Sequence, residues 1–131
     1  MSLIIRIITP DRIVWNGMAE ELIIPTSTGQ IGILKDHAPL LTTLDIGVMK
    51  IKSKTGWSSI AIMGGFGEVE ENNKVLLLCN AAEEGGSIDE KAAQDELEKV
   101  TLLVDQATTP KEKLRATREL RKAQARLQAA T

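Results

Sequence analysis

The chain has 131 residues, a hydrophobic fraction of 43% and a formal net charge of −2. This length suits one domain or a compact domain with an appendage, and the hydrophobic fraction is too high for a disordered chain. The near-neutral charge and only three aromatic residues argue against nucleic-acid binding, which uses basic surfaces and aromatic stacking. The single cysteine, Cys79, excludes an intramolecular disulfide and lies in an apolar run that predicts burial. No stretch approaches the roughly 18 apolar residues of a membrane span, so we expect no direct membrane insertion.

Short apolar runs separated by turn-forming residues fill the first part of the chain. Strands are expected at residues 3–8, 13–15, 21–24, 47–52, 57–63, 65–69 and 75–79. The pairs Asn16-Gly17 and Asn72-Asn73 are expected turns. Such a series of eight to ten short strands, without a helical interruption, predicts an antiparallel β-sandwich or barrel.

After Gly85-Gly86 the hydrophobic spacing becomes helical. Apolar residues recur at intervals of four and three, at Ala93, Leu97, Val100, Val104 and Ala107, and again at Ala116, Leu120, Ala123, Leu127 and Ala130. Two such helices with a short break between them predict an antiparallel helical hairpin. We therefore expect a β-sandwich domain over residues 1–84 and a helical hairpin over residues 85–131.

Both expected helices carry N-terminal capping signals. Ser87 is the expected N-cap of the first helix, with Glu90 completing a capping box. Thr109 is the expected N-cap of the second helix, with Pro110 at the first helical position and Glu112 as its cap partner.

The composition of the hairpin leaves two interpretations open. Three of the five apolar positions in the second helix are alanine, and each alanine in place of leucine gives up roughly 2.4 kcal/mol of potential burial. Isolated helices of this length are marginal without packing. The hairpin either covers part of the sandwich permanently or packs weakly enough to open.

Charge is sorted between the two expected helices. Residues 88–105 contain six acidic and two basic residues, whereas residues 111–130 contain seven basic and two acidic residues. One interpretation is mutual attraction between the paired helices, together with solvated faces. The other is a basic helix that docks on an acidic partner surface when the hairpin opens, and both can hold.

The sequence contains no recognisable constellation of catalytic or metal-binding residues. His37 is the only histidine and forms no metal-ligand spacing with Cys79. The adjacent glutamates at 20–21, 70–71 and 83–84 point to opposite faces of a strand, which makes poor acid–base pairs. The glycines at 64–67 lack the Lys-Ser/Thr ending of a phosphate-binding loop. We therefore expect a non-enzymatic protein without a cofactor.

Several segments closely resemble the epsilon subunits of F-type ATP synthases. The central signature is carried by Thr28-Gly29-Gln30-Ile31-Gly32-Ile33-Leu34-Lys35-Asp36-His37-Ala38-Pro39-Leu40-Leu41. Residues 8–11, 14–15, 45–47 and 63–66 also match, so the resemblance covers essentially the whole chain. The sequences of residues 43–48 and 61–66 are most similar to those of the plastid and cyanobacterial branch. Lys35 departs from the proline of many relatives, which should change the stiffness of this loop.

The resemblance implies a non-catalytic rotor subunit, peripheral on the thylakoid membrane on its stromal or cytoplasmic side. Its N-terminal part would be a ten-stranded sandwich that binds the gamma subunit and the c-ring and helps to couple proton flow to rotation. The residues that match the partner-contact regions are Thr28, Gly29, Gln30, Ile31, His37 and Pro39. For His37 a purely structural role stays equally open.

The resemblance also implies that the hairpin regulates ATP hydrolysis, being compact when hydrolysis is permitted and extended along gamma when hydrolysis is restrained. Residues 88–131 as one helical arm, 44 residues in all, would reach roughly 66 Å. The basic residues that would meet acidic segments of the alpha and beta catalytic subunits are Arg115, Arg118, Arg121, Lys122 and Arg126.

Some bacterial relatives bind ATP on the folded hairpin through an Ile-Asp-x-x-Arg-Ala motif. Here Ile88, Asp89 and Ala93 fit this motif, but Ala92 replaces the arginine. Losing a guanidinium should weaken nucleotide binding, so at most weak ATP binding is expected. The candidate nucleotide residues are Glu83, Ile88, Asp89, Arg115 and Arg126.

Two other functional classes remain open from the sequence. One is an independent β-sandwich binding module with a coiled-coil tail, and the other is a small-ligand or nucleotide sensor that acts alone. Copurification with gamma would favour the rotor subunit, whereas ligand-dependent folding without a partner would favour the sensor.

Overall fold

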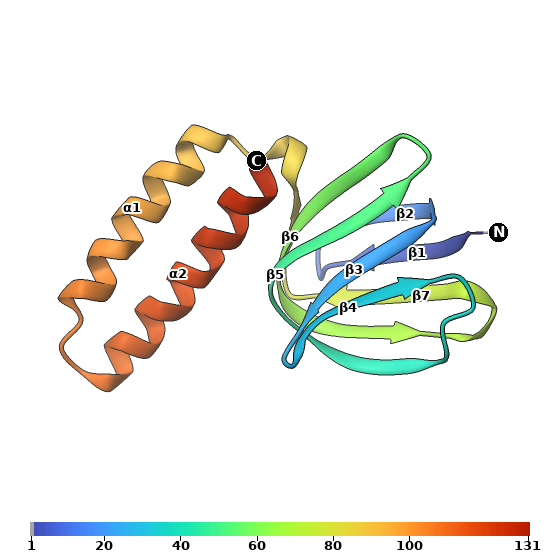
Figure 1. Ribbon diagram of the computed structural model, residues 1–131. Helices are drawn as coiled ribbons and strands as arrows, with labels where there is room; N and C mark the ends of the chain where they lie inside the picture. The colour runs from blue at the N-terminus through green and yellow to red at the C-terminus, as the bar shows by residue number, and fades with distance from the viewer. Residues whose placement is uncertain (1) are drawn as a thin grey trace.

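The computed structural model describes residues 2–131 and contains a β-sandwich followed by two helices (Figure 1). The strands are β1 (Leu3–Ile8), β2 (Ile13–Ala19), β3 (Glu21–Thr26), β4 (Gly29–Leu34), β5 (Leu40–Ser53), β6 (Gly56–Val69), β7 (Lys74–Cys79) and β8 (Ala82–Glu84). Two short 3₁₀ turns, η1 (Glu71–Asn73) and η2 (Gly85–Ser87), precede β7 and the helices. The helices are α1 (Glu90–Gln106) and α2 (Pro110–Ala130).

The strands follow the order β2-β1-β7-β6-β5-β3-β4, and β8 pairs with β6. Neighbouring strands are antiparallel except for β1 and β7, which are parallel. The first part of β5 and the last part of β6 pair with each other and, through β7, join β1 and β2. The remaining parts of β5 and β6 pair with β3 and β8. These two long strands therefore belong to both layers of the sandwich.

Gly65 marks the bend that divides β6 between the layers. Its φ of +147° is a conformation that other residues rarely adopt, and a Cβ there would overlap the carbonyl oxygen of Leu78. The strands expected at residues 57–63 and 65–69 are consequently one strand of 14 residues. Residues 2–131 form eight strands rather than the ten that the resemblance implied, and the predicted β-sandwich is confirmed.

The pair Asn16-Gly17 was expected to form a turn, which is wrong. Both residues lie inside β2, where Asn16 is opposite Arg6 and Gly17 is opposite Ile5. Continued pairing with β1 carries the strand through this pair and brings Ala19 into the core. The expected turn at Asn72-Asn73 is confirmed, because both residues have φ values near +60° and connect β6 to β7.

Aliphatic side chains that alternate along the strands form the main core of the sandwich. The largest fully buried side chains are Leu3, Ile5, Ile7, Leu22, Ile24, Ile33, Met49, Ile51, Ile60, Ile62 and Leu77. Trp57 and Phe66 are about half exposed, so aromatic rings contribute little to this core. Burial of so many branched aliphatic groups supplies the principal stabilisation of the domain.

The helices form the predicted antiparallel hairpin, and α2 lies between α1 and the sandwich (Figure 1). The N-cap of α1 is Asp89, whose carboxylate accepts a hydrogen bond from the Ala92 amide at 3.1 Å. The predicted cap at Ser87 is wrong because this residue lies in η2, where its hydroxyl donates to the Glu84 carbonyl. The predicted cap at Thr109 is confirmed by a hydrogen bond from the Glu112 amide. Within residues 2–131, no helix is long and apolar enough to cross a membrane.

Candidate functional site

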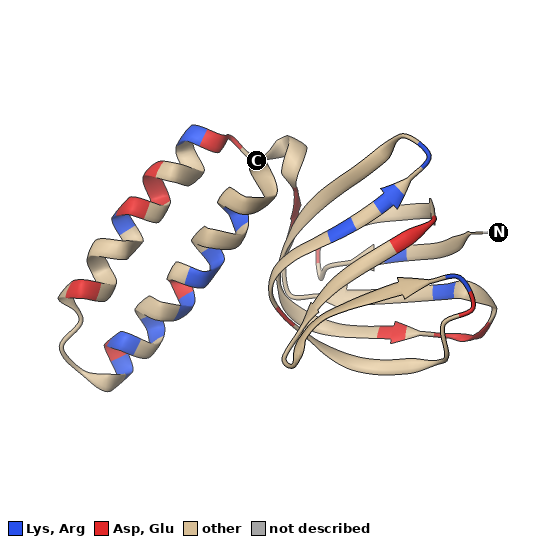
Figure 2. Cartoon of the chain, viewed as in Figure 1, with Lys and Arg blue, Asp and Glu red and all other residues tan. Residues whose placement is uncertain are grey.

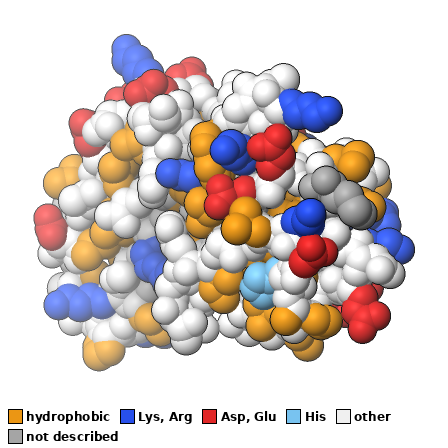
Figure 3. All heavy atoms as spheres, turned by 45° about the vertical axis from the view of Figure 1, so that its right-hand side comes forward, with side chains coloured by type: hydrophobic (Ala, Val, Ile, Leu, Met, Phe, Trp, Pro, Cys, Tyr) orange, Lys and Arg blue, Asp and Glu red, His pale blue; other side chains and the backbone are white. Residues whose placement is uncertain are grey.

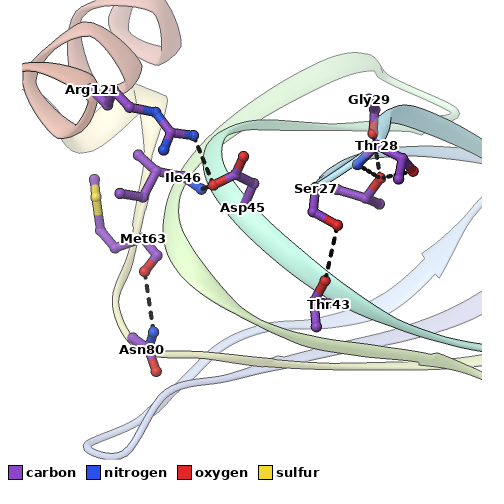
Figure 4. Close-up of polar contacts among 10 residues, drawn as sticks. Ser27, Thr28, Gly29, Thr43, Asp45, Ile46, Met63, Asn80 and Arg121 are labelled. Carbon is purple, nitrogen blue, oxygen red and sulfur yellow. Dashed lines mark hydrogen bonds and ion pairs between the residues drawn. The ribbon is translucent and has the colours of Figure 1, made fainter. Parts of the chain in front are cut away.

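The first group of candidate contact residues forms the exposed tip between β3 and β4. Thr28, Gly29 and Gln30 are exposed, whereas Ile31 is partly buried against the main core. The hydroxyl of buried Thr26 accepts a hydrogen bond from the Thr28 amide and donates one to the Gly29 carbonyl (Figure 4). Gly29 has a φ of +123°, which suits glycine in this tight turn. The tip is therefore an ordered, solvent-facing turn.

The second group of candidate contact residues lies in the loop that joins β4 to β5. His37 is partly buried and Pro39 is exposed. The ring nitrogen Nδ1 of His37 lies 2.6 Å from the Ala38 carbonyl oxygen, and the single histidine is visible at the surface in Figure 3. The buried side chain of Asn73 accepts a hydrogen bond of 2.6 Å from the Asp36 amide. Asn73 thus ties this loop to the β6–β7 turn, a contact that the sequence did not predict.

These two groups lie at opposite ends of β4. β4 has six residues, which corresponds to about 17–20 Å, and its first three residues, Gly29–Ile31, belong to the first group. The structure therefore does not bring the six candidate contact residues into one cluster. A partner that used both groups would have to follow the full length of β4.

The helical hairpin docks on the sandwich through a second, smaller apolar cluster. Its buried members are Val48, Ala61, Ile88, Ala93, Ala125 and Ala129. Ala125 and Ala129 lie outside the alanine–leucine stripe identified in the sequence, although Leu127 and Ala130 of that stripe pack against the same cluster. The sequence signal for this pair is a spacing of four between two alanines, which is weak beside the longer stripe.

Two arginines of α2 form ion pairs with the sandwich. Arg121 lies 2.7 Å from Asp45 of β5 (Figure 4), and Arg126 contacts both carboxylate oxygens of Glu83 at 3.0 and 3.2 Å. The hydrogen bond from Arg121 lowers the pKa of the Asp45 carboxyl below its ordinary value of 3.8. All these side chains are between one third and one half exposed, so each pair is expected to contribute modestly.

The charge sorting predicted for the hairpin is present, with acidic α1 facing away from the sandwich and basic α2 next to it (Figure 2). Across residues 2–131, however, no ion pair joins α1 to α2. The basic side chains of α2 that form ion pairs contact Asp45, Glu83 and, from Lys122, Glu119 of the same helix. Attraction between the helices therefore acts only at longer range.

Of the five predicted arm residues, two are held in the docked hairpin by the sandwich. Arg121 and Arg126 make the ion pairs described above, and Lys122 is 3.4 Å from Glu119. Arg115 and Arg118 are exposed on the part of α2 that is far from Glu83. Docking thus engages part of the basic surface and leaves the rest solvated.

The five candidate nucleotide residues do not converge on one site. Glu83 and Arg126 are bound to each other, Ile88 is buried in the apolar cluster, and the Asp89 carboxylate caps α1. Arg115 precedes Arg126 by 11 helical residues, or about 16 Å along α2. The depression beside the Glu83–Arg126 pair is also lined by Glu96, Glu119 and Lys122, so its three carboxylates and two basic side chains give no excess of positive charge for an anionic ligand.

The remaining candidates for chemistry among the described residues are metal-ligand clusters and the thiol of Cys79. No group of three or more potential metal ligands occurs among residues 2–131. Cys79 is buried in the main core, and desolvation raises its pKa to about 11, so the thiol is protonated near neutral pH.

Comparison with known proteins defines the family. Residues 2–85 match the family described as the ATP synthase delta/epsilon chain β-sandwich domain. The chain is 67% identical over 129 residues to the chloroplastic ATP synthase epsilon chain of Emiliania huxleyi, covering 98% of each chain. It is 50% identical over 133 residues to the ATP synthase epsilon chain of Microcystis aeruginosa, covering 99% of this chain and 96% of the relative.

A solved structure of the Euglena gracilis mitochondrial ATP synthase contains a chain of similar fold. The TM-score is 0.84 at 21% identity, with 98% of this chain and 81% of that chain covered. This likeness supports the fold, while the sequence identities support the family. The predicted resemblance is confirmed, and it assigns the chain to a non-catalytic component of ATP synthase. The chain belongs to the ATP synthase epsilon-chain family, in its chloroplast and cyanobacterial branch.

Proposed function

We propose that this epsilon chain is a central-stalk subunit that links gamma to the c-ring and restrains ATP hydrolysis when its hairpin is released. The sandwich would serve as the rotor-bound part, at the stromal or cytoplasmic periphery of the thylakoid membrane. The hairpin would serve as the regulatory part. The shallow docking of α2 on the sandwich is the observation that carries this proposal.

The sandwich offers rigid, exposed features for stable partners. The buried Thr26 hydroxyl orders the tip at Thr28–Gln30 by hydrogen bonds, and the loop at His37–Pro39 is fixed at its start, where the Asp36 amide donates to the buried Asn73 side chain. Between them, Leu41 is 73% exposed and Phe66 is 58% exposed on the outer surface of one layer. Ordered tips and exposed apolar side chains suit a lasting protein interface.

The hairpin, in contrast, has few contacts to lose on release. The buried residues that α2 contributes to its docking surface are Ala125 and Ala129, and the two ion pairs are partly solvated. Release would free Arg121 and Arg126, which would join Arg115, Arg118 and Lys122 on one basic helix. Such a helix fits an acidic surface of the catalytic subunits by charge complementarity.

The dimensions of the helices are compatible with this action. The 17 residues of α1 and 21 residues of α2 measure about 57 Å when placed end to end. An arm of this length extends well beyond the sandwich along a neighbouring stalk. We expect the basic second helix to be its distal part.

Reconstitution of ATP synthase with altered epsilon chains tests the proposal. Deleting residues 88–131 should raise ATP hydrolysis, while copurification with gamma and the c-ring should persist through the sandwich. Replacing Arg115 and Arg118 with alanine should raise hydrolysis without disturbing docking, because neither side chain pairs with the sandwich. Unchanged hydrolysis in both variants would refute the inhibitory role.

A further inference from the structure

Gly85 lies where the last turn of α2 meets the sandwich. It is a buried residue of η2, between β8 and α1. A Cβ built at this position would overlap the carbonyl oxygen of Ala129 and lie 2.9 Å from its carbonyl carbon. Both are backbone atoms, so rotating a side chain cannot relieve the overlap.

The neighbouring Gly86 provides an internal comparison. It is exposed, and a Cβ built there meets no atom within 4 Å. Neither Gly85 nor Gly86 has a positive φ, so the backbone conformation accepts other residues at both positions. The requirement for glycine at position 85 therefore comes from the close approach of α2.

We propose that Gly85 acts as a steric latch: the absence of a side chain at this position is what allows the regulatory hairpin to dock on the sandwich. The last turn of α2 can seat on η2 only when residue 85 has no side chain, because the Ala129 carbonyl occupies the space of a Cβ. Any side chain at position 85 shifts the equilibrium from the docked towards the released hairpin. The regulatory consequence rests on the proposed function, in which the released hairpin restrains hydrolysis.

Gly85 has a second close neighbour in the sheet. The same Cβ would lie 3.1 Å from the carbonyl oxygen of Ser59 in β6. If this contact dominated, a side chain at position 85 would destabilise the sandwich itself. Removing the last residues of α2 distinguishes a clash with α2 from a clash with the sheet, since it deletes the Ala129 carbonyl and leaves the Ser59 carbonyl in place.

Hydrogen exchange on the complete chain tests the latch. Gly85→Ala should accelerate exchange of the α2 amides on the order of tenfold, as expected for overpacking, with β6 and β7 unchanged. Gly86→Ala should match the wild type. In chains that end at Gln128, Gly85→Ala should cause no further acceleration. The proposal is overturned if Gly85→Ala leaves α2 protection intact, or if it loosens the strands equally with and without residues 129–131.

ATP hydrolysis by the reconstituted complex tests the consequence separately. Gly85→Ala should lower hydrolysis relative to wild type, and Gly86→Ala should not. If exchange shows a released α2 while hydrolysis stays unchanged, the latch stands and the proposed role of the released hairpin fails. If α2 stays docked, the latch fails whatever the rate of hydrolysis.

Discussion

The sandwich and the hairpin bury their side chains in different ways. All the large, fully buried side chains belong to strands of the sandwich, whereas the buried residues of the helices are Ala93, Val100, Ala123, Ala125 and Ala129. Burial of a large aliphatic side chain stabilises by about 1.5–3 kcal/mol, and alanine buries far less apolar surface. We therefore expect the sandwich to be the more stable region, a scaffold, and the hairpin to be the attachment that opens under the proposed function.

A matched pair of truncations should produce the largest difference between the regions. Ile7→Ala should lower the free energy of unfolding of the sandwich by about 3 kcal/mol, because Ile7 is fully buried. Leu127→Ala removes a half-buried side chain of α2 and should leave unfolding of the sandwich nearly unchanged. Hydrogen exchange of the strand amides in urea reports on unfolding of the sandwich, whereas tryptophan fluorescence would also respond to undocking, because Trp15 and Trp57 line a depression beside the last turn of α2. Equal losses in the two variants would mean that both regions unfold as one unit.

Charge reversal across the docking surface should have a smaller effect, confined to the hairpin. Asp45→Arg should weaken docking by about 1 kcal/mol, because the pair with Arg121 is partly exposed and repulsion would replace attraction. Faster hydrogen exchange in α2, with unchanged exchange in the strands, would report this loss. The double variant Asp45→Arg/Arg121→Asp rebuilds the pair with opposite polarity and should recover protection. Failure of the double variant to recover would show that the ion pair does not hold α2.

Much of this contrast was predictable from the sequence because it depends on local periodicity. The apolar run at residues 3–8 predicts a strand, and the change of period after Gly86 marks the start of the hairpin. Thr109 before Pro110 is a local signal for a helix start, and the structure confirms it. Features that depend on residues close together in the sequence could thus be predicted.

Features that depend on residues far apart in the sequence could not be predicted. The Glu83–Arg126 pair joins residues separated by 43 positions, and nothing local in either segment specifies the other. Asn16-Gly17 has the composition of a turn, yet pairing with β1 keeps it in a strand. The role of Gly85 also depends on a backbone atom of Ala129, which only the docked arrangement reveals.

The start of α1 offers a sharper local test within the hairpin. Asp89→Ala should cost about 1 kcal/mol of α1 stability, because the carboxylate accepts the hydrogen bond from the Ala92 amide. Ser87→Ala is the control, since Ser87 lies outside the helix and should have little effect on it. Exchange of the amides in the first turn of α1 would distinguish the two. Equal acceleration of exchange in the two variants would indicate that Ser87 contributes to capping α1, as the sequence pattern predicted.

The smallest expected effect is the pH dependence of docking through Asp45. Its pKa is lowered in the docked state by Arg121, whose guanidinium stays protonated throughout. A carboxyl with a depressed pKa stabilises docking fully above its ordinary value of 3.8 and loses this contribution as the pH falls through the lower, docked value. The strands, with their apolar core, should not share this contribution. Docking can be followed by α2 exchange between neutral pH and about pH 3.

Asp45→Asn separates this effect from other acid-sensitive groups, including Glu83. The variant keeps a polar side chain of similar size but cannot ionise, so its docking should be weaker than that of the wild type by a constant amount at neutral pH. The difference should shrink as wild-type Asp45 becomes protonated, because both side chains are then uncharged. A difference that persisted undiminished at low pH would show that the Asp45 charge does not contribute to docking. The contrast between scaffold and attachment would then rest on apolar contacts and on the second ion pair alone.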